Sequence, residues 1–130
     1  MLAKVYSAQV VGLKADLIDI EVDIARGLHS FSVVGLPDKA VEEAKDRISA
    51  AIKNSGFKSP QKSNKKVIIS LAPADLKKEG PVFDLGIAIA YLLAGAEIKF
   101  NSVGKLFLGE LALDGSLRAI KGTLMIVRQD

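Results

Sequence analysis

Residues 16–24 alternate in hydropathy, and this pattern restricts the fold more than any other segment of the chain. One face would carry Ile18, Ile20, Val22 and Ile24, and the other Leu17, Asp19, Glu21 and Asp23. A period of two is typical of a strand with one buried face. Residues 4–11, rich in β-branched and aromatic side chains, predict a preceding strand, and the short link at 12–15 favours an antiparallel hairpin.

A third strand is predicted at residues 30–34, and a helix follows it. Asp38, after Gly35-Leu36-Pro37, is the expected N-cap. Apolar residues then recur at helical spacing, at Val41, Ala44, Ile48, Ala51 and Ile52. Asn54-Ser55-Gly56 predicts the end of the helix, because Gly56 readily adopts the left-handed conformation of a C-terminal cap.

The second half of the chain predicts a strand, a buried helix and a hairpin. Residues 58–66 are polar and basic and predict an exposed loop. Residues 67–71 are apolar without alternation, which favours burial of this strand on both faces. Residues 82–94 predict an apolar core helix, residues 106–111 and 116–120 a hairpin around Asp114-Gly115, and residues 121–123 the start of another helix. The expected core includes Ile18, Ile20, Val22, Ile48, Ile52, Val67, Ile69, Leu85, Ile89 and Leu92.

Length and composition fit one domain with its own core. The chain has 130 residues, of which 49% are hydrophobic, and it contains no cysteine. The lack of cysteine excludes a disulfide framework, a thiolate zinc site and a cysteine nucleophile, and it fits a reducing cytoplasm. Charged and polar residues interrupt the N-terminal apolar stretch, so we expect no signal peptide and no membrane span. A net charge of +3 permits contact with nucleic acid without requiring it.

Motifs for catalysis and nucleotide binding are missing from the sequence. It contains neither a GxxxxGK[ST] nor a GxGxxG motif. His29 is the only histidine, and we interpret it as a loop or strand-edge residue. Ser70, Ser102 and Ser116 have no identifiable base partner, as a serine nucleophile would need. We therefore interpret them as strand or turn residues.

Three carboxylates, Asp75, Glu79 and Asp84, are loosely clustered in the sequence. They could act as oxygen ligands for magnesium. The interpretation that we prefer is that Asp75 and Asp84 cap turns or helix starts and that Glu79 is solvated. Between them, Gly80 permits a positive φ and Pro81 suits a first helical turn. This segment is either a tight turn that leads into a core helix or a helix N-terminus that binds an anion.

Five stretches in the same order along nearly the whole chain resemble one family. The most specific is residues 71–81 with Phe83-Asp84-Leu85, in which we single out Asp75, Lys77, Lys78, Glu79, Gly80, Pro81 and Asp84 as the signature turn. The others are residues 21–24 with Arg26-Gly27-Leu28, residues 33–38, residues 50–57, and residues 108–111 with 113–118. The pattern is similar to the N-terminal domain of the magnesium-chelatase-like AAA+ ATPases, the YifB and ComM group.

The resemblance implies an α+β fold of the ribosomal protein S5 domain 2-like type, with a mixed sheet packed against helices, over residues 1–130 as a single domain. It implies a parent protein whose AAA+ ATPase module, which binds ATP and magnesium, lies outside this chain. It also implies a cytoplasmic hexamer that acts as a DNA branch-migration motor. Expected partners are the AAA+ module, copies of the same chain and DNA, with no membrane.

The Lon protease domain shares the implied fold but not the residues that would cleave a peptide. Lon-like proteases place a serine directly after a Gly-Pro pair, and here Val82 follows Gly80-Pro81. The position of the Lon lysine falls near Ile126. The resemblance therefore implies a chain with no catalytic, cofactor-binding or metal-binding residue, which supports assembly or guides DNA to the motor. Two alternatives are a degenerate domain that binds a peptide or anion at the Gly80-Pro81 turn, and a pure oligomerisation module.

Lys58, Lys62, Lys65 and Lys66 are the candidate DNA contacts. They lie within nine residues that contain no acid and no aromatic side chain. Such a cluster would contact phosphates with little base specificity, and its binding would weaken with salt. The alternative is an ordinary solvated loop.

Overall fold

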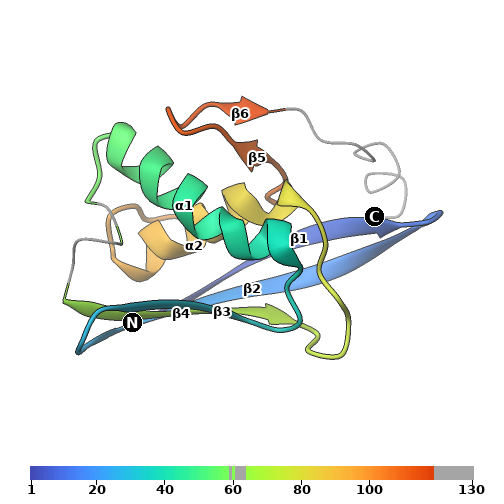
Figure 1. Ribbon diagram of the computed structural model, residues 1–130, viewed down its shortest axis with the longest axis horizontal. Helices are drawn as coiled ribbons and strands as arrows, with labels where there is room; N and C mark the ends of the chain where they lie inside the picture. The colour runs from blue at the N-terminus through green and yellow to red at the C-terminus, as the bar shows by residue number, and fades with distance from the viewer. Residues whose placement is uncertain (59, 61–63, 119–130) are drawn as a thin grey trace.

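A computed structural model describes residues 1–58, 60 and 64–118. These residues form a mixed four-stranded sheet with two α-helices on one of its faces (Figure 1). The strands are β1 (Leu2–Val11), β2 (Lys14–Arg26), β3 (Ser30–Val34) and β4 (Lys65–Ala72), in the spatial order β1-β2-β4-β3. Strands β3 and β4 are parallel, and the other neighbours are antiparallel. This arrangement confirms an α+β fold with a mixed sheet.

The β1–β2 hairpin is longer than predicted, with only Gly12-Leu13 between its strands. The predicted alternation of β2 is confirmed, because Ile18, Ile20 and Val22 are fully buried on the face that meets the helices. The opposite face of β2 carries Asp19, which forms an ion pair with Lys4 of β1 at 3.2 Å.

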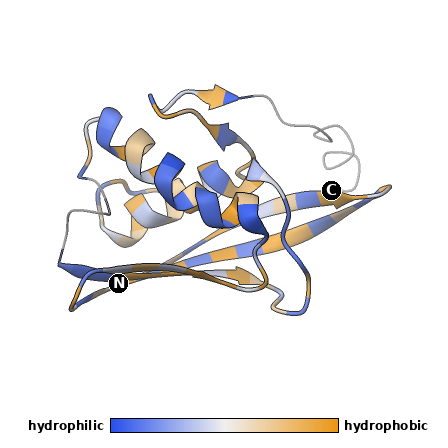
Figure 2. Ribbon diagram, in the orientation of Figure 1, coloured by the Kyte–Doolittle hydropathy of each residue, from blue (hydrophilic) through white to orange (hydrophobic). Residues whose placement is uncertain are grey.

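Helix α1 (Lys39–Asn54) connects the parallel strands β3 and β4. Its N-cap is confirmed, because the Asp38 carboxylate accepts a hydrogen bond of 2.8 Å from the backbone N–H of Val41. Its C-terminus is confirmed as well, with Gly56 at a φ of +91° just beyond Ser55. Apolar residues of α1 face the core, and polar residues lie on its outer side (Figure 2).

The apolar core helix begins as a short 3₁₀ turn, η2 (Pro81–Phe83), and continues as α2 (Asp84–Ala94), which packs across β1 and β2. Leu85 and Ile89, which were predicted to belong to the core, pack against it without being fully buried. They are half-buried, because they line an open apolar hollow of about 140 Å³ between α1 and α2. Ile87 faces the sheet instead and is fully buried.

The prediction that β4 is buried on both faces was also wrong. Val67, Ile69 and Leu71 are fully buried, whereas Ile68 and Ser70 on the other face are partly exposed. The helices cover one side of the sheet only, so the opposite side of β4 meets no second layer among the described elements (Figure 1).

The final hairpin is shorter than predicted. It consists of β5 (Glu110–Leu111) and β6 (Leu117–Arg118), joined through the expected Asp114-Gly115 turn. Leu106 forms an isolated bridge with Tyr6 of β1 instead. The helix predicted from residue 121 lies outside the described residues. Within the described part of the chain, no helix is long and apolar enough to cross a membrane.

Candidate functional site

The predicted site residues lie at opposite ends of the sheet. Strand β4 starts at Lys65 and leads into the signature turn at its other end. We call the start of β4, together with Arg26 at the end of β2, the basic end. We call residues 35–38 and 73–81, which meet beyond the ends of β3 and β4, the motif end.

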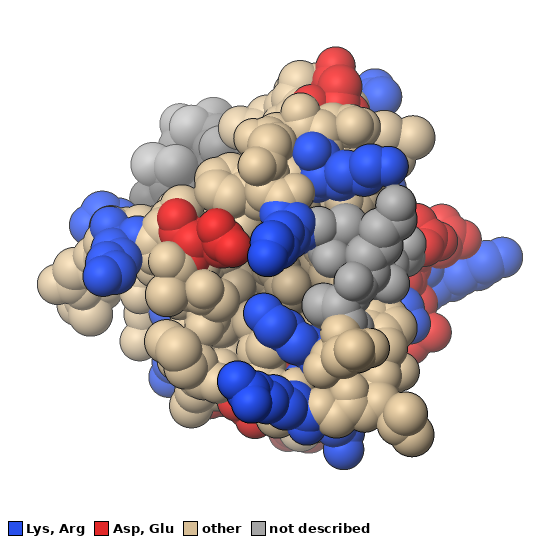
Figure 3. Space-filling view, turned by 90° about the vertical axis from the view of Figure 1, so that its left-hand side faces the viewer, with Lys and Arg blue, Asp and Glu red and all other residues tan. Residues whose placement is uncertain are grey.

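At the basic end, the strand register brings cationic side chains together. Arg26 pairs directly with Lys65, and Lys66 pairs with Ser30 of β3. Because neighbouring strand residues point to opposite faces, Lys65 shares the helix side of the sheet with Arg26, and Lys66 lies on the outer side. Figure 3 shows Lys and Arg side chains on the side of the molecule where this end of the sheet lies.

The four lysines predicted to contact DNA have different positions. Lys58 is exposed in the connection between α1 and β4. Lys65 and Lys66 are exposed too, but they belong to β4, so the prediction of a loop through residue 66 was wrong there. The β2–β4 ladder extends to the Arg26–Lys65 pair and thereby orders them as strand. Lys62 lies outside the described residues.

The cations of the basic end are available to a ligand. Within the described ranges, no carboxylate lies within 4.0 Å of the charged groups of Arg26, Lys58, Lys65 or Lys66. Sequence reasoning missed Arg26, since only the strand register places it across from Lys65. The combined cations suit the phosphates of a polyanion.

At the motif end, Asp38 joins two segments that are far apart in the sequence. Its backbone N–H donates to the carbonyl of Lys78 at 2.9 Å, and the N–H of Lys78 donates to the carbonyl of Leu36 at 2.9 Å. The second carboxylate oxygen of Asp38 accepts from the N–H of Gly80 at 3.0 Å. One side chain therefore caps α1 and fixes the signature turn.

Gln9 of β1 holds the same turn from the other side. Its side-chain amide donates to the carbonyl of Lys77 at 2.9 Å and accepts from the N–H of Glu79 at 3.1 Å. Gln9 is almost fully buried. The backbone groups of Lys77, Glu79 and Gly80 therefore have hydrogen-bond partners within the protein.

Lys78 is fully buried within this turn. Its ammonium group donates to the carbonyl of Pro73. Burial lowers the pKa of Lys78, while the charge of Asp75 opposes that shift. Sequence reasoning gave no sign of this burial, because the run Lys77-Lys78-Glu79 has the composition of a solvated turn.

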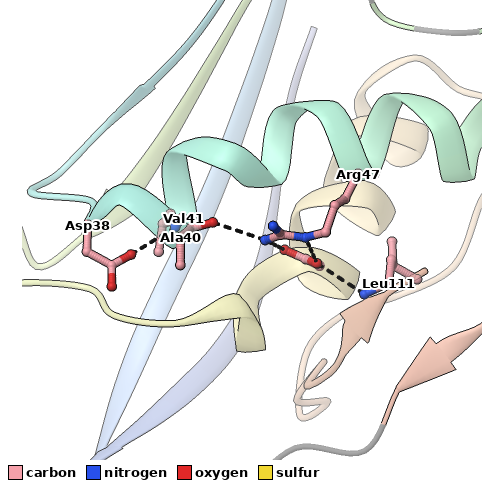
Figure 4. Close-up of polar contacts among 6 residues, drawn as sticks. Asp38, Ala40, Val41, Arg47 and Leu111 are labelled. Atoms are coloured by element: carbon pink, nitrogen blue, oxygen red, sulfur yellow. Dashed lines mark hydrogen bonds and ion pairs between the residues drawn. The ribbon is translucent and has the colours of Figure 1, made fainter. Parts of the chain in front are cut away.

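Asp84 was interpreted as a turn or helix cap, and this was wrong. It is fully buried, and the guanidinium of Arg47 on α1 binds both of its oxygens, at 2.7 and 2.9 Å (Figure 4). The backbone N–H of Leu111 in β5 donates to the same carboxylate at 3.1 Å. Burial raises the pKa of Asp84, and the contacts with Arg47 and Leu111 oppose that shift. The carboxylate thus joins α2, α1 and β5.

The structure argues against a magnesium site and an anion site at the motif end. Asp75 and Glu79 are exposed, whereas the buried carboxylate of Asp84 forms an ion pair with Arg47. The described residues contain no group of three or more His, Asp or Glu side chains that could hold a metal. Gly80 has a φ of +81° and Pro81 starts η2, as expected, but the Asp38 carboxylate occupies the N–H that an anion would use.

The lone histidine and the three serines lie in loops, strands or turns, as interpreted from the sequence. His29 is exposed immediately before β3, and Ser70 lies within β4. The hydroxyl of Ser102 donates to the carbonyl of Lys4 at 2.8 Å. The hydroxyl of Ser116 donates to Asp114 at 2.7 Å in the β5–β6 turn.

Comparisons with known proteins agree on one family. A family model described as subunit ChlI of Mg-chelatase matches residues 20–129. The competence protein ComM of Haemophilus influenzae is 44% identical over 124 residues, which cover 95% of this chain and 24% of that protein. The uncharacterized protein YifB of Escherichia coli is 45% identical over the same shares. Rv2897c of Mycobacterium tuberculosis is 39% identical over 97% of this chain. The chain spans about a quarter of the length of these relatives.

Proposed function

The chain belongs to the family of the Mg-chelatase subunit ChlI, and from this premise we propose that it is the non-catalytic N-terminal domain of a magnesium-chelatase-like AAA+ ATPase. Its proposed fold is of the ribosomal protein S5 domain 2-like type. The AAA+ module of the parent protein would bind ATP and magnesium, and the parent would assemble as a hexamer. The role that we propose for this domain is to guide DNA to a branch-migration motor.

One observation carries the DNA role. Arg26, Lys58, Lys65 and Lys66 are exposed cations that form no ion pair with the described carboxylates. By contrast, Asp84 of the signature turn forms an ion pair within the fold, with Arg47. Unpaired cations release counterions from DNA when they bind phosphates, and this favours binding without base specificity.

Two triple variants with the same loss of charge test this role. The first changes Lys58, Lys65 and Lys66 to glutamine. The matched control changes three exposed lysines at the other end of the sheet, Lys14, Lys39 and Lys77. Fluorescence anisotropy with labelled duplex and branched DNA measures the affinity of each protein over a range of salt concentrations.

We expect the basic-end variant to lose most of the binding that the parent chain shows at low salt. Its logarithmic salt slope should fall by about 2–3, since each phosphate contact contributes about 0.9. The control should keep the parent's slope. Equal losses in both variants would mean that net charge alone drives binding, and no binding by the parent chain would refute the DNA role. A pure oligomerisation module would show self-association without DNA binding.

A further inference from the structure

Leu28 is the most exposed large apolar side chain among the described residues, with 95% of its surface accessible. It contributes nothing to the core, although it belongs to Arg26-Gly27-Leu28, one of the stretches that resemble the family. An isolated exposed leucine on a surface is common and needs no explanation by itself. Leu28, however, lies beside cations that have no ion-pair partner among the described carboxylates, and this suggests a role in binding.

Paired strands on both sides fix the place of the connection that carries Leu28. The β2–β4 ladder ends at the Arg26–Lys65 pair, and β3 begins where Ser30 pairs with Lys66. Only residues 27–29 lie between these two points, and the N–H of Gly27 donates to the carbonyl of Asn64 at 3.4 Å. Leu28 therefore projects from a short turn that both cationic strand ends hold in place.

We propose that Leu28 is an apolar wedge that enters DNA at a weakly stacked step while the cations of the basic end hold the phosphates beside it. This inference rests on the DNA contact proposed above. Many proteins that bind the minor groove of DNA insert leucine or similar side chains between base steps and partly unstack them. A wedge of this kind would favour branch points and mismatches, where unstacking requires less free energy than in an intact duplex.

The charges around Leu28 favour DNA as the occupant over a protein. Three cations without a described ion-pair partner surround the turn that carries Leu28. Arg26 precedes Leu28 by two residues, and strand pairing places Lys65 opposite Arg26 and Lys66 opposite Ser30. The centre of a protein interface is depleted in charge. Met1 is also exposed and lines a hollow with Arg26 and Lys65, so a protein partner is the competing occupant.

Fluorescence of 2-aminopurine, placed at the branch point of a DNA junction, tests the wedge directly because the base brightens when it unstacks. Three variants are compared with the parent chain. Leu28→Ala removes the wedge, and Leu28→Met keeps an apolar side chain of similar length. Leu13→Ala is the matched control, since Leu13 is 86% exposed at the tip of the β1–β2 hairpin, away from the basic end.

With the parent chain we expect the fluorescence at saturation to rise by about twofold or more. Leu28→Ala should abolish this rise while its affinity for DNA changes by less than about threefold, because the phosphate contacts remain. Leu28→Met should restore the rise, and Leu13→Ala should match the parent. Thermal melting should be unchanged in all three variants, because both leucines lie outside the core.

Three outcomes would overturn the wedge. If the parent and Leu28→Ala bind DNA and brighten the probe equally, Leu28 is not a wedge, and the DNA contact itself survives. If Leu28→Ala instead changes the mass of the protein in sedimentation without affecting the probe, Leu28 contacts another protein chain. Failure of the parent to bind DNA at all would refute the DNA contact and the wedge together.

Discussion

The two ends of the sheet use their polar residues in opposite ways. At the motif end, Asp38 and Gln9 hold the signature turn through hydrogen bonds, and Lys78 is buried in it. At the basic end, Arg26, Lys65 and Lys66 are exposed and form no ion pair with the described carboxylates. The signature turn therefore stabilises the fold, while the cations of the basic end remain available to a ligand.

This difference predicts how substitutions divide between the ends. Changes at the motif end should reduce the free energy of unfolding, because they leave buried polar groups without partners. Changes at the basic end should alter binding and leave stability nearly constant.

Arg47→Met should have the largest effect on stability. It leaves the fully buried Asp84 carboxylate without its cation, which typically costs about 3–5 kcal/mol. Burial already raises the pKa of Asp84, and without Arg47 the pKa should rise further. An acid with a raised folded pKa stabilises the protein most when protonated, so the variant should regain stability as the pH falls.

Urea denaturation of the parent and the Arg47→Met variant at pH 7 and pH 5 measures this effect. The double variant Arg47→Met/Asp84→Asn is the control, because asparagine removes the charge and still accepts from Leu111. It should be more stable than Arg47→Met at pH 7. A single variant that matches the parent at pH 7 would show that the ion pair does not hold α1 against α2.

Gly35→Ala should destabilise the motif end by about 3 kcal/mol or more. Gly35 has a φ of +106°, and an added Cβ would lie 2.0 Å from the carbonyl oxygen of Leu71. Left-handed strain and the overlap with the backbone add together. Gly27→Ala at the basic end is the matched control, because its added Cβ meets nothing within 4 Å. Similar melting temperatures for the two variants would contradict the close approach at Gly35.

Local patterns in the sequence predicted the elements that local physics determines. The alternation of residues 16–24 identified the buried face of β2, and Asp38 was recognised as an N-cap. Burial of β4 was mispredicted, because an apolar run does not reveal whether a second layer covers the sheet. Arg47 and Asp84 are 37 residues apart, and only the packing of α1 on α2 brings them together.

The candidate site shows the same division. The signature turn was recognised from its residues, but its hydrogen bonds to Gln9 and Asp38 span 68 and 42 residues. The burial of Lys78 was missed, because its neighbours Lys77 and Glu79 are charged and exposed. Arg26 was missed as part of the basic end, since the register between β2 and β4 is a long-range property.

Lys78→Met should also change the pH dependence of stability. Burial holds the folded pKa of Lys78 below its ordinary value of 10.5. The unfolded chain therefore binds more protons between the folded pKa and 10.5, and the parent gains stability as the pH rises through that window. The variant lacks this gain. Denaturation at several pH values from neutral to 10.5 should show a steeper rise for the parent, and parallel curves would contradict burial of a charged Lys78.

Replacement of Lys58, Lys65 and Lys66 by glutamine should have the smallest effect on stability, within about 0.5 kcal/mol of the parent. The three side chains are exposed, and no described carboxylate pairs with them, so the folded state loses no partner. Less repulsion among the cations should raise the melting temperature slightly at low salt, and added salt should remove that difference. Thermal melting at low and high salt measures both effects. A large loss of stability in this variant would mean that the basic end, like the motif end, is occupied by contacts within the fold, and its lysines would no longer be candidates for binding DNA.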